Sequence, residues 1–259
     1  MRRRINQSYF VLLLAAWALS GQAAEPGLRQ DAGVFRSAYT NWTYPLRVYL
    51  PSGYAESEQR YPVLYALDGE IRFDLITEQL DELSAEVIVV AIGATSNARR
   101  EIDFVIPGAS AYTRFLTEEL IPWADANYRT DPAERALAGH SLAGLLSALM
   151  FLFEDPEQRY FSSFLISDAS FWDKPEKTRQ LIEALRVKTD SVPVILFIAA
   201  GAKGNAATKG NLEGTRRFHS LLQDSNFADL DMHYEIYKTN HKDVIRPSFT
   251  DGLAYLYAE

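Results

Sequence analysis

The chain of 259 residues contains no cysteine. This absence excludes disulfide bonds, a thiol nucleophile, iron–sulfur clusters and a lipidated anchor cysteine. Histidine is also scarce, with four residues, His140, His219, His233 and His241. No two of them have the helical or hairpin spacing typical of a metal site. We therefore expect no metal, and no pattern in the sequence implies an organic cofactor.

Long apolar runs are missing as well, and the longest near the start covers only Tyr9 to Leu19. Three arginines, Arg2 to Arg4, precede this run, and small residues follow it at 21–24. This order predicts a signal peptide over residues 1–24, with a periplasmic or secreted protein as the result. A membrane-anchoring first helix and a twin-arginine export signal are the alternatives. Residues 25–259 are expected to form a single domain.

Positive charge is in deficit, since 26 Lys and Arg stand against 34 Asp and Glu, which gives a net charge of −8. Removal of residues 1–24 takes away three arginines and no acid, so the charge becomes −8 − 3 = −11. An acidic protein of this kind is not expected to bind nucleic acid or, after signal removal, an anionic membrane surface. A small molecule is the expected partner, and the sequence does not indicate the oligomeric state.

Short apolar runs alternate with amphipathic stretches after an extended segment at 25–40. Strands are expected at 46–50, 63–67, 87–92, 135–138, 164–167, 192–200 and 232–237. Helices are expected around 112–123, at 142–153, at 177–188, after an Asn211 cap, and at 246–257. This alternation predicts the α/β class, with a mainly parallel sheet flanked by helices. Ligands of such sheets bind beyond the carboxyl ends of the strands.

A serine stands in that position, in the string Gly139-His-Ser141-Leu-Ala143-Gly144 between a predicted strand and an apolar helix. This context is that of a nucleophile elbow, whose flanking positions must be small. Ala143 replaces the more usual glycine. We expect Ser141 to be the nucleophile and the N–H group of Leu142 to be one oxyanion donor. The alternative is a serine that caps a core helix.

The general base is expected to be His241, because it follows the last predicted strand and precedes the closing helix. The other three histidines lie beside the serine, within a helix or within a strand. A third group normally orients such a histidine, but the expected loop, residues 201–205, has no carboxylate.

Several groups remain open for this third role. They are Asp168 after the strand at 164–167, Glu213, Asp243, or a Ser–His dyad supported by backbone or by Asn205. The turn Asp68-Gly69-Glu70 follows an early strand. The N–H group of Gly69 or of Glu70 is the expected second oxyanion donor.

The chain resembles the esterase-D-like α/β-hydrolases, which include the enterobactin and salmochelin esterases. The matching strings are Tyr61–Glu70, Arg100–Phe104, Phe115–Pro122, Tyr128–Asp131, Ala138–Leu142, Ser167–Trp172, and His241 with Pro247. The resemblance implies an α/β-hydrolase fold and a serine esterase that forms an acyl-enzyme. It matches Ser141 to the nucleophile, His241 to the base and residues 68–70 to the oxyanion loop. It places Trp172 near the substrate.

A siderophore trilactone is the specific substrate that this resemblance favours, and aryl or short-chain esters are alternatives. Two other functions remain open. One is a hydrolase scaffold that has lost catalysis and only binds a ligand, because a fold does not fix a function. The other is an acyltransferase that uses the same serine.

Overall fold

The computed structural model describes residues 25–258 except 173, 174 and 205, with only the backbone of 175 and 206–209. The predicted signal peptide therefore lies outside the described residues, as does Asn205. Among the helices of the described residues, none combines the length and the apolar character needed to cross a bilayer.

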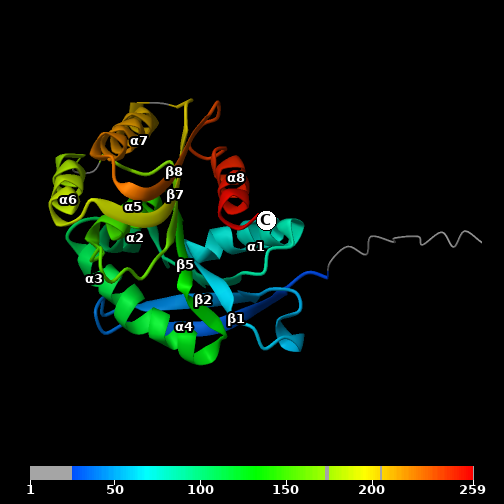
Figure 1. Ribbon diagram of the computed structural model, residues 1–259. Coiled ribbons are helices and arrows are strands. Elements are labelled where there is room, and N and C mark those ends of the chain that lie inside the picture. Colours follow the sequence, from blue (N-terminus) through cyan, green and yellow to red (C-terminus); the bar gives the residue numbers. More distant parts are fainter. Residues whose placement is uncertain (1–24, 173–174, 205, 259) are drawn as a thin grey trace, which may run out of the picture.

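Eight strands form one sheet at the centre of the molecule (Figure 1). They are β1 (Leu28–Arg36), β2 (Thr43–Leu50), β3 (Tyr61–Leu67), β4 (Ile88–Ile92), β5 (Thr130–His140), β6 (Ser163–Ser167), β7 (Ser191–Gly201) and β8 (Ala228–Tyr237). The strand order is β1-β2-β4-β3-β5-β6-β7-β8. Strand β2 pairs antiparallel with both β1 and β4, and the other pairs are parallel. The predicted α/β class and mainly parallel sheet are confirmed.

Helices cover both faces of the sheet. They are α1 (Gly69–Leu83), α2 (Asn97–Asp103), α3 (Gly108–Arg114), α4 (Ile121–Asn127), α5 (Leu142–Phe153), α6 (Pro175–Lys188), α7 (Ala206–Ser225) and α8 (Ile245–Tyr257), with a 3₁₀ turn at Tyr54–Glu56. Helices α1 and α8 lie on one face, and α5, α6 and α7 lie on the other (Figure 1). Because both faces are covered, the central strands are apolar without alternation, as predicted.

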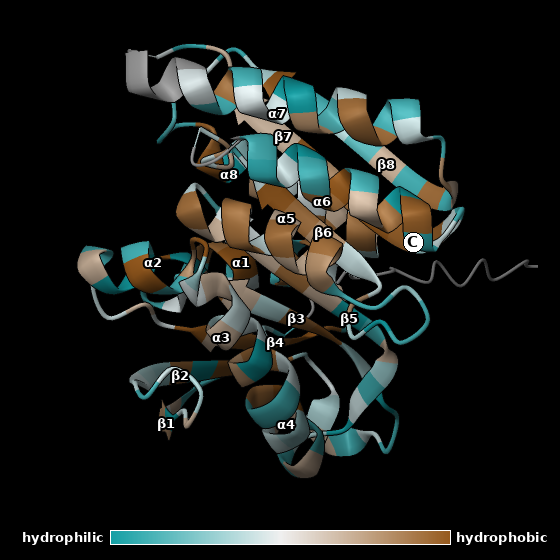
Figure 2. Cartoon of the chain, turned by 90° about the vertical axis from the view of Figure 1, so that its left-hand side faces the viewer, coloured by the Kyte–Doolittle hydropathy of each residue, from teal (hydrophilic) through white to brown (hydrophobic). Residues whose placement is uncertain are grey.

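The core consists of two layers, one on each side of the sheet. On one side, Phe73 and Ile76 of α1 and Phe249 and Leu253 of α8 are buried in the same cluster as alternate residues of β3, β4 and β5. On the other side, α5 is buried along almost its whole length, and Figure 2 shows it as mostly hydrophobic. Helix α5 directly follows the serine, so the surroundings of Ser141 are anchored in the buried core of the molecule.

The structure differs from the sequence-based expectations at several places, and helices α1 and α2 are among the elements that the sequence did not predict. Asn211 does not cap α7, because the helix already begins at Ala206. The extended segment at 25–40 contains β1, an edge strand whose exposed residues hide its pairing with β2. The helix expected around 112–123 consists of α3, a π-helical turn at Phe115–Leu120 and α4.

Strand register brings the chemically important loops to one level. Ala66 of β3 lies beside Ala138 of β5, and His140 of β5 lies beside Ser167 of β6. Ser167 in turn lies beside Ala199 of β7. Residues 68–70, Ser141 and Asp168, which follow these positions, therefore meet at the same carboxyl edge.

Candidate active site

Ser141 occupies a strained turn between β5 and α5. Its backbone has φ 63° and ψ −121°, a conformation that non-glycine residues rarely adopt. Backbone hydrogen bonds hold it there. The N–H group of Ser141 donates to Ser167 O at 3.0 Å, and its carbonyl accepts from Leu145 N at 2.9 Å and Ser170 N at 3.1 Å. The strain turns the side chain out at the start of a buried helix, as an elbow requires.

The small residues around the serine are dictated by backbone contacts. A Cβ atom on Gly139 would lie 2.3 Å from the carbonyl oxygen of Ala143. A Cβ atom on Gly144 would lie 2.8 Å from the carbonyl oxygen of Ser167. The methyl group of Ala143, in contrast, is fully buried within the core. The departure from glycine at position 143 is therefore accommodated, whereas positions 139 and 144 have no space for a side chain.

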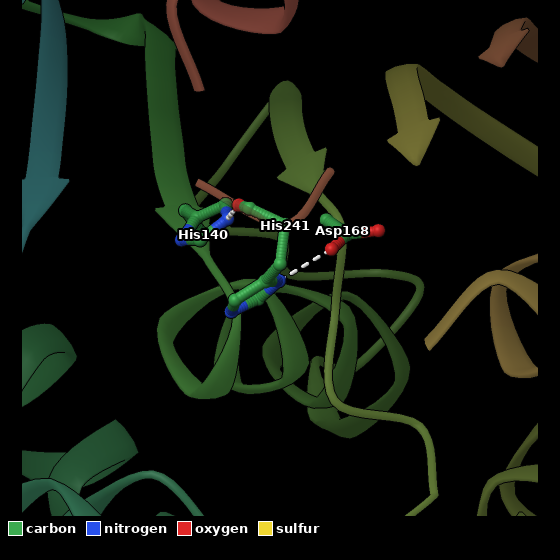
Figure 3. A group of neighbouring side chains, drawn as sticks. All are labelled: His140, Asp168 and His241. Atoms are coloured by element: carbon green, nitrogen blue, oxygen red, sulfur yellow. Dashed lines mark hydrogen bonds and ion pairs between the residues drawn. The ribbon is translucent and has the colours of Figure 1, made fainter. Parts of the chain in front are cut away.

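His241 lies in the loop between β8 and α8, and its ring meets the carboxylate of Asp168. Nδ1 of His241 donates a hydrogen bond to Oδ2 of Asp168 (Figure 3). Asp168 is almost completely buried, whereas the His241 side chain is 27% exposed. The other carboxylate oxygen, Oδ1, accepts from Gly201 N at 3.0 Å. Two hydrogen bonds thus fix the carboxylate, and Nε2 is left as the ring nitrogen that faces away from it.

Asn211 also contacts this pair, which the sequence did not indicate. Its Nδ2 lies 3.1 Å from the carbonyl oxygen and 3.4 Å from Oδ2 of Asp168, and 3.3 Å from Nδ1 of His241. Asn211 is buried on the inner side of α7. The only signal in the sequence was an amide on the apolar face of an amphipathic helix, which the capping interpretation misread.

The hydroxyl of Ser141 has a neighbour that the sequence analysis also missed. Within the described part of the chain, its one hydrogen bond joins Ser141 Oγ to Ser170 Oγ at 3.3 Å. The loop of His241 contacts the residue before Ser141, because the carbonyl oxygen of His241 lies 2.9 Å from Nε2 of His140. Among the described residues, the Ser141 hydroxyl is not hydrogen-bonded to the imidazole of His241. Hydrogen bonds between such groups are often loose without substrate.

The turn before α1 presents backbone N–H groups beside the elbow. Asp68 adopts a left-handed conformation, with φ 56° and ψ 41°, and α1 begins at Gly69. The N–H groups of Ile71 and Arg72 bond to the carbonyl of Asp68. Those of Gly69 and Glu70 come before the first intrahelical bond. A Cβ atom on Gly69 would lie 2.8 Å from the backbone of β4, so this turn requires glycine.

Two side-chain contacts fix this turn. Arg100 of α2 donates from Nε and Nη2 to both oxygens of Asp68, at 2.7 and 2.8 Å. Burial raises the pKa of the Asp68 carboxyl, and the charge and hydrogen bonds of Arg100 oppose that rise. Glu70 accepts a hydrogen bond from Ala94 N at 2.9 Å. The residues on both sides of Gly69 are therefore tied to the segment that follows β4.

The structure separates the remaining candidates from this centre. Glu213 is exposed on α7, and Asp243 accepts from Asn240 Nδ2 at 2.6 Å. His219 stacks on Tyr234, and His233 stacks on Phe197. Of the acids that the sequence left open, the structure brings Asp168 to His241.

Trp172 lies after β6, four residues beyond Asp168. Its side chain is 57% exposed. A Cβ atom on Gly210 of α7 would lie 3.3 Å from that of Trp172, so this part of α7 passes beside the tryptophan. The indole is therefore displayed at the carboxyl edge of the sheet and is not a core residue.

The same centre contains three potential metal ligands. Ligand atoms of His140, Asp168 and His241 lie within 4.8 Å of one another. However, Nε2 of His140 bonds to a carbonyl oxygen, and Nδ1 of His241 bonds to the Asp168 carboxylate. An ion bound by these atoms would have to break both hydrogen bonds. The donor set fits a hydrogen-bonded acid–base pair better than a cation site.

Together, the strand order and a serine on a strained turn between β5 and α5 define an α/β-hydrolase. The chain belongs to the Esterase family, described as "Putative esterase", whose model matches residues 37–256. It is accordingly a carboxylic ester hydrolase, as the sequence predicted.

Similar proteins of known name or structure agree with this class. Ferri-bacillibactin esterase BesA of Bacillus subtilis (strain 168) is 26% identical over 206 residues, which cover 66% of this chain and 69% of BesA. The structure of an IroE-like serine hydrolase from Shewanella oneidensis is 26% identical, with a TM-score of 0.75, and the match covers 90% of this chain and 80% of that one. Siderophore hydrolase EstB from Aspergillus nidulans is 20% identical, with a TM-score of 0.74 over 89% of this chain and 95% of its own, and shows the shared fold.

Proposed function

We propose that Ser141 is the nucleophile of this esterase, His241 its general base and Asp168 the group that orients the base. The observation that carries this proposal is the hydrogen bond between Nδ1 of His241 and the buried Asp168 carboxylate, next to the strained turn of Ser141. The bond fixes the tautomer with a hydrogen on Nδ1. Nε2 is then free to accept a proton from the serine.

The reaction follows from these positions. His241 Nε2 takes the hydroxyl proton as Ser141 Oγ attacks the ester carbonyl, and a tetrahedral oxyanion forms. The imidazolium then gives the proton to the leaving alkoxide, and an acyl-enzyme remains. A water molecule, deprotonated by the same nitrogen, attacks the acyl carbon. This attack forms a second tetrahedral intermediate. When that intermediate collapses, the carboxylic acid is released and the imidazolium returns the proton to Ser141 Oγ.

Backbone N–H groups stabilise the oxyanion in this scheme. Leu142 is the first residue of α5, and Gly69 and Glu70 are the first two residues of α1. Both helix N-termini lie at the ends of the adjacent strands β5 and β3. Amides and helix dipoles in that position favour negative charge on the attacked oxygen. The rigid turn at Asp68 keeps one set of donors in place before substrate arrives.

The substrate class that we propose is an ester-linked siderophore. Two similar proteins are named for such compounds, BesA for ferri-bacillibactin and EstB as a siderophore hydrolase. Three large apolar side chains, Ile71, Ile102 and Trp172, are 56–60% exposed after the carboxyl ends of β3, β4 and β6. Such a rim suits a bulky ligand with aromatic groups. The rim is where Trp172 contacts the substrate in this proposal.

Charge bears on which form of the siderophore is cleaved. The chain carries a net charge of −8, so long-range attraction does not favour an anionic ferric complex. The iron-free ester is at least as good a candidate. If residues 1–24 act as a signal peptide, cleavage takes place in the periplasm or outside the cell.

Covalent labelling tests the nucleophile. A fluorophosphonate probe is expected to attach to Ser141 of the wild-type protein, and Ser141→Ala is expected to abolish both labelling and the hydrolysis of p-nitrophenyl acetate. Saturable binding of an ester with no labelling would mean that the chain is only a binding protein. Faster acyl transfer to an added alcohol than to water would mean that it is an acyltransferase.

Competing substrates test the substrate class. The specificity constants kcat/KM are measured for an iron-free trilactone siderophore, its ferric complex and p-nitrophenyl acetate. We expect kcat/KM for the iron-free trilactone to exceed kcat/KM for p-nitrophenyl acetate by at least about 10²-fold. The reason is that binding energy from the remote parts of a true substrate lowers the reaction barrier. Equal constants would overturn the siderophore proposal and leave the esterase mechanism intact.

A further inference from the structure

We propose that His140 is a positioning residue for His241, because its side chain ties the loop of the base to the strand of the nucleophile. This inference rests on the proposed roles of Ser141 and His241. It adds a function for the residue directly before the serine, which the mechanism above does not use.

The contact joins two distant parts of the chain. Nε2 of His140 lies 2.9 Å from the carbonyl oxygen of His241, across 101 positions of sequence (Figure 3). The two imidazole rings also face each other, with centroids 4.5 Å apart and an interplanar angle of 34°. His140 is 96% buried at the end of β5, because its relative exposure is 4%. A buried residue on a central strand gives the contact a rigid base.

The loop that carries His241 depends on such contacts. Residues 238–244 connect β8 to α8, and most of them are exposed or half-buried. Several of their hydrogen bonds are internal, since Asn240 Oδ1 accepts from the N–H groups of Lys242 and Asp243. The N–H group of Lys203, after β7, donates to Thr239 O at 2.8 Å. These bonds fix the shape of the loop and connect it to the segment after β7, but none of them connects it to β5, the strand that precedes Ser141.

His140 supplies this connection between the loop of His241 and β5. Ser141 is its neighbour in sequence, so any shift of the β5 end moves the serine and the tether together. Asp168 fixes the ring of His241 from one side through Nδ1, and His140 fixes the backbone of His241 from the other. The distance between Ser141 Oγ and the base is thereby determined by two short connections. A misplacement of about 1 Å between reacting groups can cost on the order of 10²-fold in rate.

The tether also requires a particular state of His140. A carbonyl oxygen only accepts, so Nε2 must carry the hydrogen. Burial, the neighbouring His241 and the guanidinium groups of Arg72 and Arg100 hold the pKa of His140 well below its usual value. His140 therefore stays neutral and adds no positive charge beside His241 when that ring accepts the serine proton.

Two substitutions of similar size separate the hydrogen bond from the packing. In His140→Gln the amide Nε2 reaches the position of the imidazole Nε2 and can donate to the carbonyl of His241. In His140→Met the side chain has similar length and no donor. Kinetics with p-nitrophenyl acetate are expected to show kcat about 10–100-fold lower for His140→Met with KM within about threefold of wild type. His140→Gln is expected to recover kcat to within about fivefold.

Controls distinguish failure of this inference from failure of the proposed function. His233→Gln, in β8 against Phe197 and Tyr255, should behave as wild type. Wild-type kcat for His140→Met, with Ser141→Ala inactive, would overturn the tether alone. Activity of Ser141→Ala would overturn the proposed function itself.

A comparison of His140→Asn with His140→Gln tests the tether if His140→Met does not fold. His140→Asn also carries an amide, but it is one methylene group too short to reach the carbonyl of His241. We expect His140→Asn to lose kcat where His140→Gln retains it, with melting temperatures compared for both. Equal kcat values for the two variants, whether high or low, would refute the tether.

Discussion

Asp168 accepts a hydrogen bond from Nδ1 of His241, although the two residues lie 73 positions apart. The contact arises because Asp168 directly follows β6 and the loop of His241 follows β8, with β7 between the two strands. The carboxylate is buried and receives a second hydrogen bond from Gly201 N. An acid that follows β6, and not one that follows β7, is therefore the hydrogen-bond partner of the imidazole in this structure.

Removal of the negative charge of Asp168 should impair catalysis more than folding. We expect Asp168→Asn to lower kcat on the order of 10³-fold with little change in KM, because the amide can stabilise the wrong tautomer of His241 and no longer supports its positive charge. Steady-state kinetics measure both constants. Glu213→Gln on the exposed side of α7 and Asp243→Asn should stay within about threefold of wild type. Full activity of Asp168→Asn would indicate a Ser–His dyad.

Asn211 should matter for both stability and rate. Asn211→Leu keeps the volume of the side chain but removes the donor that lies 3.1 Å from the Asp168 carbonyl. Loss of one buried hydrogen bond is expected to cost about 1–3 kcal/mol in the free energy of unfolding. Urea denaturation measures this cost, and kcat should fall about tenfold as the carboxylate loses a constraint. Unchanged kcat would mean that the hydrogen bonds from Gly201 N and His241 Nδ1 are sufficient to hold the Asp168 carboxylate.

The ion pair between Arg100 and Asp68 is predicted to maintain the oxyanion turn. In Arg100→Met the buried Asp68 carboxylate loses both guanidinium bonds, which should destabilise the fold by about 3 kcal/mol. Chemical denaturation measures that change, and kcat should fall with KM little altered. Arg114→Met is the matched control, because Arg114 pairs with Glu118 on the surface, where solvent screens the pair and its loss changes stability little. Equal effects of the two variants would contradict the prediction.

A methyl group should destabilise the protein at position 139 and stabilise it at position 143. Gly139→Ala places Cβ 2.3 Å from a backbone oxygen, so we expect loss of activity and a lower melting temperature. Ala143→Gly restores the more usual elbow residue and should keep kcat within a few-fold. Its cost is about 1 kcal/mol of stability, since glycine is a poor helix residue. Thermal unfolding and p-nitrophenyl acetate hydrolysis, measured on both variants, test the contrast.

Glu154 at the end of α5 should make stability depend on pH. Burial raises the pKa of its carboxyl from 4.5 to about 7, against the opposing charge of Arg159 and the N–H groups of Tyr160 and Phe161. The folded state then binds a proton that the unfolded state has released. The stability of the wild type relative to Glu154→Gln should be greatest below about pH 4.5 and fall as the pH rises toward 7. The fall is at most about 3 kcal/mol.

The free energy of unfolding of both proteins at pH 5 and pH 8 provides the measurement. Arg179, which pairs with Glu176 and Glu183 on the surface of α6, offers a control site where Arg179→Met should not alter the pH dependence. A stability difference between wild type and Glu154→Gln that stays constant from pH 5 to pH 8 would contradict the prediction.

Much of this architecture follows from short-range patterns. Helix α5 begins at Leu142 and ends at Phe153, as its apolar run predicted. The observed bounds of the strands predicted at 63–67 and 164–167 lie within two residues of the prediction. The prediction is accurate here because a short, uninterrupted apolar segment between turn residues is typical of a buried strand. Strand β1 was missed as a paired strand, since its pairing lies at an exposed edge and leaves little periodicity.

The sequence by itself determined the class of the protein. The string from Gly139 to Gly144, between an apolar strand and an apolar helix, defines an elbow locally, and chain order selects His241 among four histidines. Only the tertiary structure decided how Asp168, Asn211 and His140 contact His241. These contacts join residues 30 to 101 positions apart. They depend on which strands lie side by side and in what register, and this is decided when strands distant in the sequence pair and the core closes.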